Sequence, residues 1–265
     1  MRDTPLTRRL RIAVHRALAR LGVAAGRDPL GRGFRVRRLP RLGRDPLADV
    51  KRILARTPRV VFDVGAHRGE SALAFLHAFP GAAIHSFEPD PAACAALREA
   101  LRPYPRASAH CLALGDAEGE ATLHRAAFGQ MSSLLPVAAR AGEHHDAALL
   151  RPAGEVAVCR TTVDRFRAEH GTGPVDLLKI DTQGYELHVL RGAAEALARG
   201  EIGLVYLEVQ LVPVYEGQPP FSALLDFLGG YGYRLVGLYD PGFRGRHYLA
   251  EADALFVSER LPAPR

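Results

Sequence analysis

The chain has 265 residues, 48% of them hydrophobic and 24% charged, which is enough to bury one large core and support an appendage. No run approaches the roughly eighteen apolar residues of a membrane span, and the arginine-rich start lacks the apolar core of a secretory signal. The net charge of +6 is uneven, because residues 1–60 carry 17 Arg and Lys against 4 Asp and Glu, and the rest carry 18 against 25. We therefore expect a cytoplasmic protein whose excess of positive charge lies in residues 1–60.

The first part of the chain is predicted to be a leader that precedes the main domain. Apolar residues at helical spacing, with arginines mostly between them, predict an amphipathic helix over Thr7–Val23. Glycines and prolines from Gly22 to Pro40 predict an irregular connector, and Leu47–Ala55 is predicted to be a helix. We divide the chain into a helical leader and connector, residues 1–46, and a main domain, residues 47–265.

An arginine-rich helix is compatible with several partners. Packing on its own domain or on a partner protein is favoured over a peripheral contact with the inner face of a membrane. Nucleic acid is not expected, since no aromatic side chains are interleaved with the arginines as a stacking platform. The sequence carries no signal for an oligomeric state.

Cysteine and histidine patterns give no metal prediction. Cys94, Cys111 and Cys159 are odd in number and lack metal-ligand spacing, so we expect three reduced packing residues. The triplet His144-His145-Asp146 lies in a polar stretch, where adjacent histidines more often face solvent than bind a metal.

The run from Val60 to Ser71 predicts a strand, a tight turn and the start of a helix. Gly65 and Gly69 permit a positive φ and a close approach of the backbone to a ligand, and the helix N-terminus supplies unpaired N–H groups. A cofactor site is therefore predicted at this turn. The Gly-x-Gly-x-x-Gly fingerprint of dinucleotide-binding folds is not met, because its second glycine is missing.

Two further strands are predicted to end in acidic residues. Ala83–Phe87 runs into Glu88, at the position where such folds hold the hydroxyls of a ribose. After a helix, the predicted third strand Ser108–Leu114 runs into Asp116. Crossover order would place both acids and the first turn at the carboxyl ends of consecutive parallel strands, where open α/β sheets bind ligands.

The second half of the chain continues the alternation. Residues 126–153 form a long irregular stretch, which predicts a lid or binding loop. A buried strand then ends at Asp181 and enters the predicted helix Tyr185–Ala198. Later strands, one with Glu208 near its tip, complete an α/β fold with a doubly wound, mostly parallel seven-stranded sheet and an N-terminal helical extension.

Two motifs resemble those of one family. Residues 63–69 are similar to Asp-Val-Gly-Ala-Asn-x-Gly, and residues 179–186 to Lys-Ile-Asp-x-Glu-Gly-x-Glu, of the FkbM family of class I S-adenosylmethionine (SAM) methyltransferases. The resemblance covers about residues 50–260 and does not include the leader. His67 stands where the family has asparagine, and Gln183 where it has glutamate, which removes one candidate base.

The resemblance implies a Rossmann-like fold that binds SAM. Glu88 would take the ribose hydroxyls, and Asp116 could accept a hydrogen bond from the adenine amine, although helix capping or a turn is an alternative role for each carboxylate. The cofactor-binding residues predicted in this way are Asp63, Gly65, Ala66, His67, Gly69, Glu88, Pro89 and Asp116.

If the methyl acceptor is a hydroxyl, a base near the transferred methyl group has to take the proton of that hydroxyl. Asp181 is the first candidate, with capping of the following helix as its alternative role. Glu186 and Glu208 are lesser candidates, since Glu186 lies in the first turn of a helix, where the helix dipole alone could explain an acid. Lys179 is predicted to pair with a carboxylate, because an unpaired charge in a buried strand is costly.

The resemblance implies a SAM-dependent O-methyltransferase acting on a sugar hydroxyl of a glycan, glycolipid or secondary metabolite. Two alternatives stay open: a non-catalytic SAM-binding regulatory module, and a methyltransferase acting on RNA or protein. The sequence lacks an aromatic-flanked Asn/Asp-Pro-Pro-Tyr run after the fourth strand, which argues against methylation of amino groups on bases.

Overall fold

The computed structural model describes residues 23–27, 34–38, 42–244 and 247–261. Contacts divide the chain into two units at Arg44/Asp45. In the first unit, β1 (Val23–Arg27) and β2 (Phe34–Arg38) form an antiparallel pair. The predicted irregular connector is therefore wrong over these strands, where the alternating Phe-Arg-Val-Arg sequence of β2 favours extended chain. Apart from Val23, the predicted leader helix lies outside the described residues.

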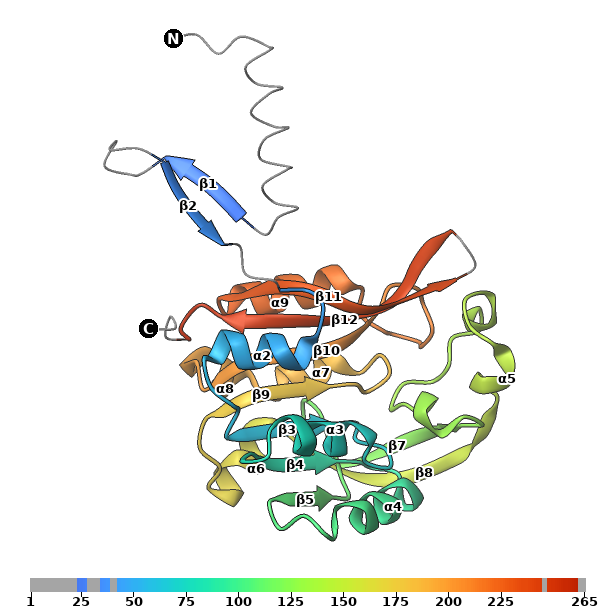
Figure 1. Ribbon diagram of the computed structural model, residues 1–265. Helices are drawn as coiled ribbons and strands as arrows, with labels where there is room; N and C mark the ends of the chain where they lie inside the picture. The colour runs from blue at the N-terminus through green and yellow to red at the C-terminus, as the bar shows by residue number, and fades with distance from the viewer. Residues whose placement is uncertain (1–22, 28–33, 39–41, 245–246, 262–265) are drawn as a thin grey trace. The chain divides into compact units, whose positions relative to one another are not determined.

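The second unit is built on a seven-stranded sheet with the order β11-β12-β10-β9-β3-β4-β5 (Figure 1). Neighbours from β5 to β10 are parallel, whereas β12 is antiparallel to both β10 and β11. The predicted α/β fold with a mostly parallel seven-stranded sheet is confirmed. The strands are β3 (Val60–Val64), β4 (Ala83–Phe87), β5 (Ala107–His110), β9 (Val175–Ile180), β10 (Ile202–Gln210), β11 (Tyr233–Arg244) and β12 (Tyr248–Ser258).

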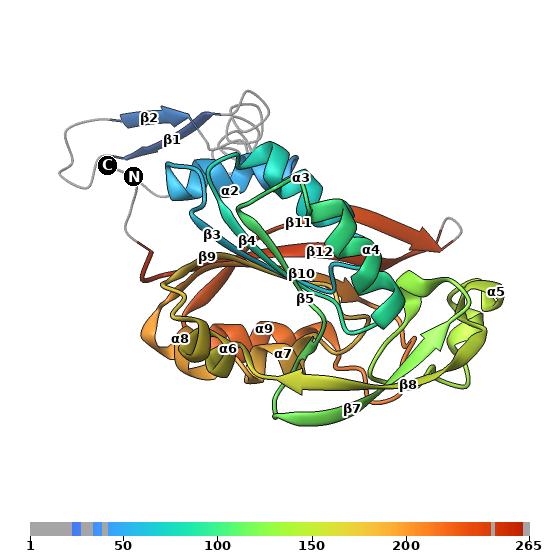
Figure 2. The same ribbon diagram turned by 90° about the horizontal axis from the view of Figure 1, so that it is seen from below.

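Helices cover both faces of this sheet (Figure 2). One face carries α2 (Pro46–Leu54), α3 (Glu70–Ala78) and α4 (Pro91–Leu101). The other carries α6 (Val163–His170), α7 (Glu186–Arg191), α8 (Ala194–Arg199) and α9 (Phe221–Gly230). Each layer buries its own apolar cluster against the sheet, so the sheet is enclosed on both faces, as parallel strands require.

The predicted helix Tyr185–Ala198 is divided into α7 and α8. The division falls at Gly192, where a Cβ would overlap the carbonyl oxygen of Gly115. Glycine is therefore needed where these two backbones come into close contact.

The predicted third strand is also divided, and this changes the position of Asp116. Only β5 belongs to the main sheet, whereas β6 (Ala113–Leu114) pairs with β8 (Pro152–Thr161) in a three-stranded sheet completed by β7 (Gly119–Ala126). At the break, Leu112 N donates to His110 O at 3.0 Å, and the chain leaves one sheet for the other.

The cysteines correct a second prediction. Cys94 on α4 and Cys111 at the end of β5 form a disulfide, with their Cα atoms 5.6 Å apart, so the expectation of three reduced cysteines is wrong for this pair. Cys159 is free and exposed. The local spacing of the sequence could not pair the two, because α4 and the end of β5 meet only in the folded chain.

Short elements occupy the long connection between β7 and β8. They are two 3-10 helices, Gly129–Met131 and Ala141–Glu143, and the single turn α5 (Ala147–Leu150). This stretch packs against residues after β10, where Ala141 and Leu150 join Val214 and Tyr215 in a third apolar cluster.

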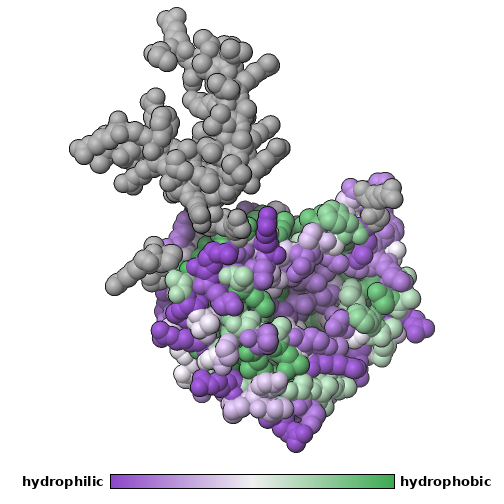
Figure 3. Space-filling view, in the orientation of Figure 1, coloured by the Kyte–Doolittle hydropathy of each residue, from purple (hydrophilic) through white to green (hydrophobic). Residues whose placement is uncertain are grey.

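The visible surface is mixed in character. Figure 3 shows hydrophilic residues interspersed with hydrophobic ones over the face seen in Figure 1. Within the described ranges, every helix is too short or too polar to cross a bilayer.

The first turn and the fourth parallel strand meet at Gly65. Asp181 N donates to Val64 O at 3.0 Å, which joins the end of β9 to the end of β3. Gly65 has a φ of +78°, and a Cβ there would overlap the carbonyl oxygen of Asp181. Glycine is therefore needed at this position for strand packing as well as for access of a ligand to the backbone.

We predict that Gly65→Ala lowers the free energy of unfolding by about 3 kcal/mol, because the added methyl meets both the left-handed backbone penalty and the Asp181 carbonyl. Gly81→Ala is the matched control, since nothing lies within 4 Å of its Cβ position. Urea denaturation followed by circular dichroism compares the two variants. Equal stability of both would contradict this account of Gly65.

Candidate active site

A cavity of about 650 Å³ opens at the carboxyl ends of β3, β4, β9 and β10. Its volume falls in the range of sites for small molecules and cofactors. Seven of the residues predicted from the sequence line it: Gly65, Ala66, His67, Glu88, Pro89, Asp181 and Glu208. The sheet edge thus brings together residues from four strands that are far apart in sequence.

Glu88 is held at the tip of β4 by backbone donors. His67 N donates to one carboxylate oxygen at 2.9 Å, and Asp90 N donates to the other at 2.8 Å. Burial raises the pKa of Glu88 to about 7, against the lowering effect of these two hydrogen bonds. His67 has a φ of +46°, a conformation that asparagine and histidine adopt more readily than most residues. Each oxygen keeps a further lone pair for a ligand in the cavity.

Lys179 joins the ends of β3 and β9. Its Nζ donates to Gly65 O at 3.0 Å and lies 3.2 Å from Asp63 Oδ1 and 3.6 Å from Asp181 Oδ2. Burial would lower the pKa of Lys179, but the charges of Asp63 and Asp181 raise it above its usual value. The predicted pairing of Lys179 with a carboxylate is confirmed. Asp63 is fully buried, and its carboxylate also accepts a hydrogen bond from Ser71 Oγ at 2.7 Å. It therefore stabilises the turn between β3 and α3.

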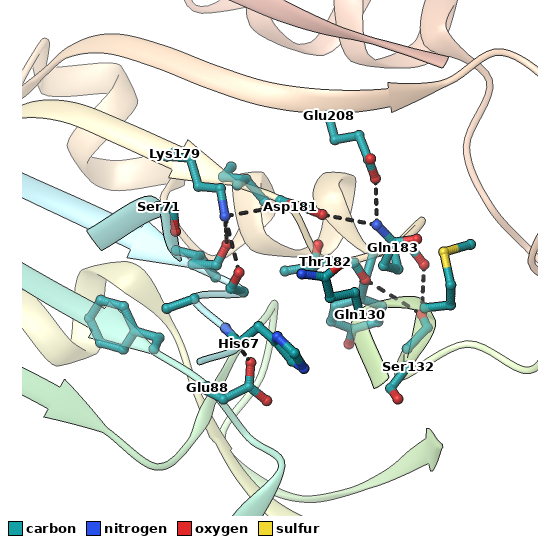
Figure 4. Close-up of a pocket in the computed structure, with 18 of the residues that line it drawn as sticks. His67, Ser71, Glu88, Gln130, Ser132, Lys179, Asp181, Thr182, Gln183 and Glu208 are labelled. Carbon is teal, nitrogen blue, oxygen red and sulfur yellow. Dashed lines mark hydrogen bonds and ion pairs between the residues drawn. The ribbon is translucent and has the colours of Figure 1, made fainter. Parts of the chain in front are cut away.

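Asp181 and Glu208 lie on either side of an amide. Gln183 Nε2 is 3.0 Å from Asp181 Oδ1 and 2.6 Å from Glu208 Oε2 (Figure 4). The Asp181 side chain is 37% exposed. Burial, followed by the charges of Asp181 and Glu186, raises the pKa of Glu208 well above its usual value. Asp181 is therefore the more suitable of the two as a proton acceptor.

The carboxylate of Glu186, the remaining candidate base, accepts hydrogen bonds from the turn before α7. It is buried, and its Oε1 accepts from Thr182 N at 3.0 Å and from Gly184 N at 3.1 Å. Burial raises the pKa of Glu186 to about 7. It is not among the residues that line the cavity, and its contacts are those of a residue that orders a turn.

Asp116 and Gly69 also lie outside the lining. Asp116 follows β6 in the smaller sheet, and its carboxylate lies 2.7 Å from His188 Nδ1 and 3.4 Å from the Tyr185 hydroxyl. The predicted common edge of three consecutive strands therefore fails at Asp116, because the chain has changed sheets before it. Gly69 precedes α3 with a φ of +101°, and a Cβ there would crowd Leu97.

One wall of the cavity comes from the connection predicted to be a lid or binding loop. Residues 128–134, together with His145 and Leu149, line it. The Tyr215 hydroxyl lies 3.0 Å from Met131 O in this wall and 2.9 Å from Gln183 Oε1. The sequence reasoning missed Tyr215, because no local pattern marks a residue that acts through distant contacts.

The triplet 144–146 is engaged in protein contacts. His144 Nδ1 lies 3.1 Å from the Tyr248 hydroxyl, and Asp146 accepts from Ala148 N at 2.9 Å. The His145 side chain is only 5% exposed and lies 3.7 Å from Glu251, so its predicted exposure to solvent is wrong. Across the described part of the chain, no three His, Cys, Asp or Glu side chains are grouped as metal ligands.

Comparison with solved structures gives distant likenesses. A Streptococcus mutans protein in complex with SAH has a TM-score of 0.44 and 13% identity, covering 80% of this chain and 95% of that one. Precorrin-6y C5,15-methyltransferase of Geobacter metallireducens has a TM-score of 0.41 and 10% identity, with coverages of 80% and 88%.

Comparison of the sequences is more specific. The model of the methyltransferase FkbM domain matches residues 63–235. The 2-O-methyltransferase NoeI of Sinorhizobium fredii is 30% identical over 197 residues, which cover 73% of this chain and 79% of that protein. The 31-O-demethyl-FK506 methyltransferase FkbM of Streptomyces tacrolimicus is 31% identical over 214 residues, with coverages of 70% and 76%. The chain belongs to the FkbM family of methyltransferases.

Proposed function

We propose that this chain is a SAM-dependent O-methyltransferase that acts on a sugar hydroxyl of a glycan, glycolipid or secondary metabolite. The observation that carries the proposal is Asp181, a partly exposed carboxylate beside Lys179 that shares its cavity with Glu88. The names of both relatives refer to a methyl group on oxygen, which supports the choice of a hydroxyl acceptor.

The residues that line the cavity fit SAM. Glu88 offers acceptor oxygens to the two ribose hydroxyls, and the apolar residues Leu112–Leu114 and Phe128 line the same cavity and suit an adenine ring. Gly129 has no side chain, and a Cβ there would lie 3.2 Å from His67 Nε2, so a larger residue would crowd the His67 ring in the cavity. The backbone at Gly65 and Ala66 would face the methionine part.

When bound, SAM supplies a methyl group already activated on a cationic sulfonium. The protein has to orient the acceptor and remove its proton. Asp181 is the proposed base, since it lies 3.6 Å from Lys179 and part of its carboxylate is exposed to the cavity. Glu208, which lines the same cavity, can exchange hydrogen bonds with the acceptor, and Glu186 keeps the turn before α7 in place.

Polar side chains in the rest of the cavity favour a hydroxyl-rich acceptor. Tyr206, Asp253 and Glu251 line it, and each can exchange hydrogen bonds with hydroxyl groups. Carboxylates outnumber the cationic side chains of Lys179 and Arg244 in this lining, which disfavours the phosphates of RNA. A cytoplasmic location, and contact of the leader with a partner protein or a membrane, are proposals that rest on sequence alone.

We predict that Glu88→Gln weakens SAM binding by about tenfold or more, because it replaces charge-assisted hydrogen bonds to two hydroxyls. Since the pKa of Glu88 is raised to about 7 and binding favours the ionised form, wild-type affinity should fall as pH drops below about 7. The variant should lose this dependence. Isothermal titration calorimetry of SAM from pH 5.5 to 8 measures both effects.

Glu99→Gln is the matched control, because Glu99 is an exposed acid on α4 that pairs with Arg102 on the surface. Unchanged SAM affinity in Glu88→Gln, or tight binding of NAD by the wild type, would contradict the cofactor assignment.

We predict that Asp181→Asn lowers turnover by about a hundredfold or more, since asparagine keeps the shape of the side chain and cannot accept the proton. SAM affinity should change by less than about threefold, because the proposed ribose contacts lie on β4. The assay transfers labelled methyl from SAM to a panel of glycans, glycolipids and hydroxylated metabolites, with RNA and protein as further acceptors.

Asp226→Asn, an exposed change on α9, serves as the control for turnover. Normal turnover of folded Asp181→Asn would exclude Asp181 as the base. Labelling of RNA or protein alone would reject the sugar acceptor, and SAM binding without transfer to any acceptor would favour a regulatory module.

A further inference from the structure

The amide of Gln183 bridges two carboxyl groups. Its Nε2 is 3.0 Å from Asp181 and 2.6 Å from Glu208. Both neighbours present acceptor oxygens, so the amide nitrogen must face them, and its two N–H bonds supply one donor for each. A carboxylate of the same size at this position would supply no donor when ionised and only one when protonated.

Hydrogen bonds with Tyr215 and Ser133 hold Gln183 in place. Its Oε1 lies 2.9 Å from the Tyr215 hydroxyl, whose pKa is raised by burial and by the charge of Glu208, so the hydroxyl keeps its proton as a donor. Ser133 Oγ donates to the backbone carbonyl of Gln183 at 2.7 Å. The residue is only 6% exposed and has a φ of +56°, an uncommon conformation that these contacts hold in place.

The charges around this bridge explain why it is needed. Asp181, just after β9, faces Lys179 on that strand, and Glu208 on β10, Glu186 on α7 and Asp253 on β12 also face it. Lys179 is the one cation in this set, and Asp63 shares it. Two carboxyl groups in such surroundings repel when ionised, and a neutral double donor between them offsets that repulsion.

We propose that Gln183 is a positioning residue for methyl transfer: its amide, anchored by Tyr215, holds the carboxyl groups of Asp181 and Glu208 in fixed positions. Asp181 is thereby oriented toward the acceptor hydroxyl. This inference rests on the proposed function for the role of Asp181. The bridge itself can be tested without an acceptor.

The test follows the Glu208 carboxyl of the full chain by NMR over a pH titration, using ¹³C-carboxyl labelling of glutamate and Glu208→Gln to assign the signal. Removing donors from a carboxylate disfavours its ionised form, so Gln183→Met should raise the midpoint of the Glu208 titration by about one pH unit. Gln183→Glu should raise it further, because it adds a like charge. A midpoint that moves by less than about 0.3 unit in Gln183→Met would overturn the proposal.

Gln218→Met is the control. The Gln218 amide also joins several groups, since its Oε1 accepts from Val214 N and Tyr215 N, but it does not contact either carboxyl group. It should lower the melting temperature and leave the Glu208 midpoint unchanged. An equal shift in this variant would make the effect one of loop packing and would also overturn the proposal.

If Gln183→Met does not fold, Tyr215→Phe replaces it, because it keeps the amide and removes only its anchor. A smaller shift in the same direction supports the proposal, and no shift overturns it. Calorimetry with SAM on the same samples tests the proposed function separately from the bridge. Failure of the wild type to bind SAM rejects the proposed function. The Glu208 titration still decides whether Gln183 bridges the two carboxyl groups.

Discussion

The site depends on one buried ammonium group. Lys179 lies between Asp63, at the end of β3, and Asp181, just after β9, and it also donates to Gly65 O. A buried charge without partners would cost several kcal/mol, so the folded chain must bring these groups to Lys179. The carboxylate that we assign as the base is thereby placed by the same interaction that joins the two central strands. The same contact therefore stabilises the fold and positions the proposed base.

Two turns with unusual backbone lie on either side of this contact. His67 and Gln183 have φ values of +46° and +56°, and a hydrogen bond to the backbone holds each of them. His67 N donates to Glu88, and Gln183 O accepts from Ser133 Oγ. Such conformations persist when surrounding contacts impose them, and they gather at functional sites. The two positions at which this chain departs from the family motifs are thus positions where the backbone is constrained.

Much of the fold and part of the site could be predicted from the sequence. The strand ends at Gly65, Glu88 and Asp181 were predictable because apolar runs stop at them and local turn chemistry marks them. Asp116 was not, because the chain changes sheets between β5 and β6, and no local pattern in the sequence marks that change. The roles of the other acids depend on burial and hydrogen bonds that only the folded chain supplies, as Glu186 illustrates.

The central claim is that this sheet edge holds a methyl donor next to an acceptor hydroxyl, with Asp181 beside the hydroxyl to accept its proton. A crystal structure of the chain with SAH tests it most directly. The account predicts both ribose hydroxyls on the Glu88 carboxylate, adenine against Leu112–Leu114, and the sulfur directed toward the space beside Asp181. Binding of SAH away from Glu88, or with its sulfur directed away from Asp181, would contradict the account.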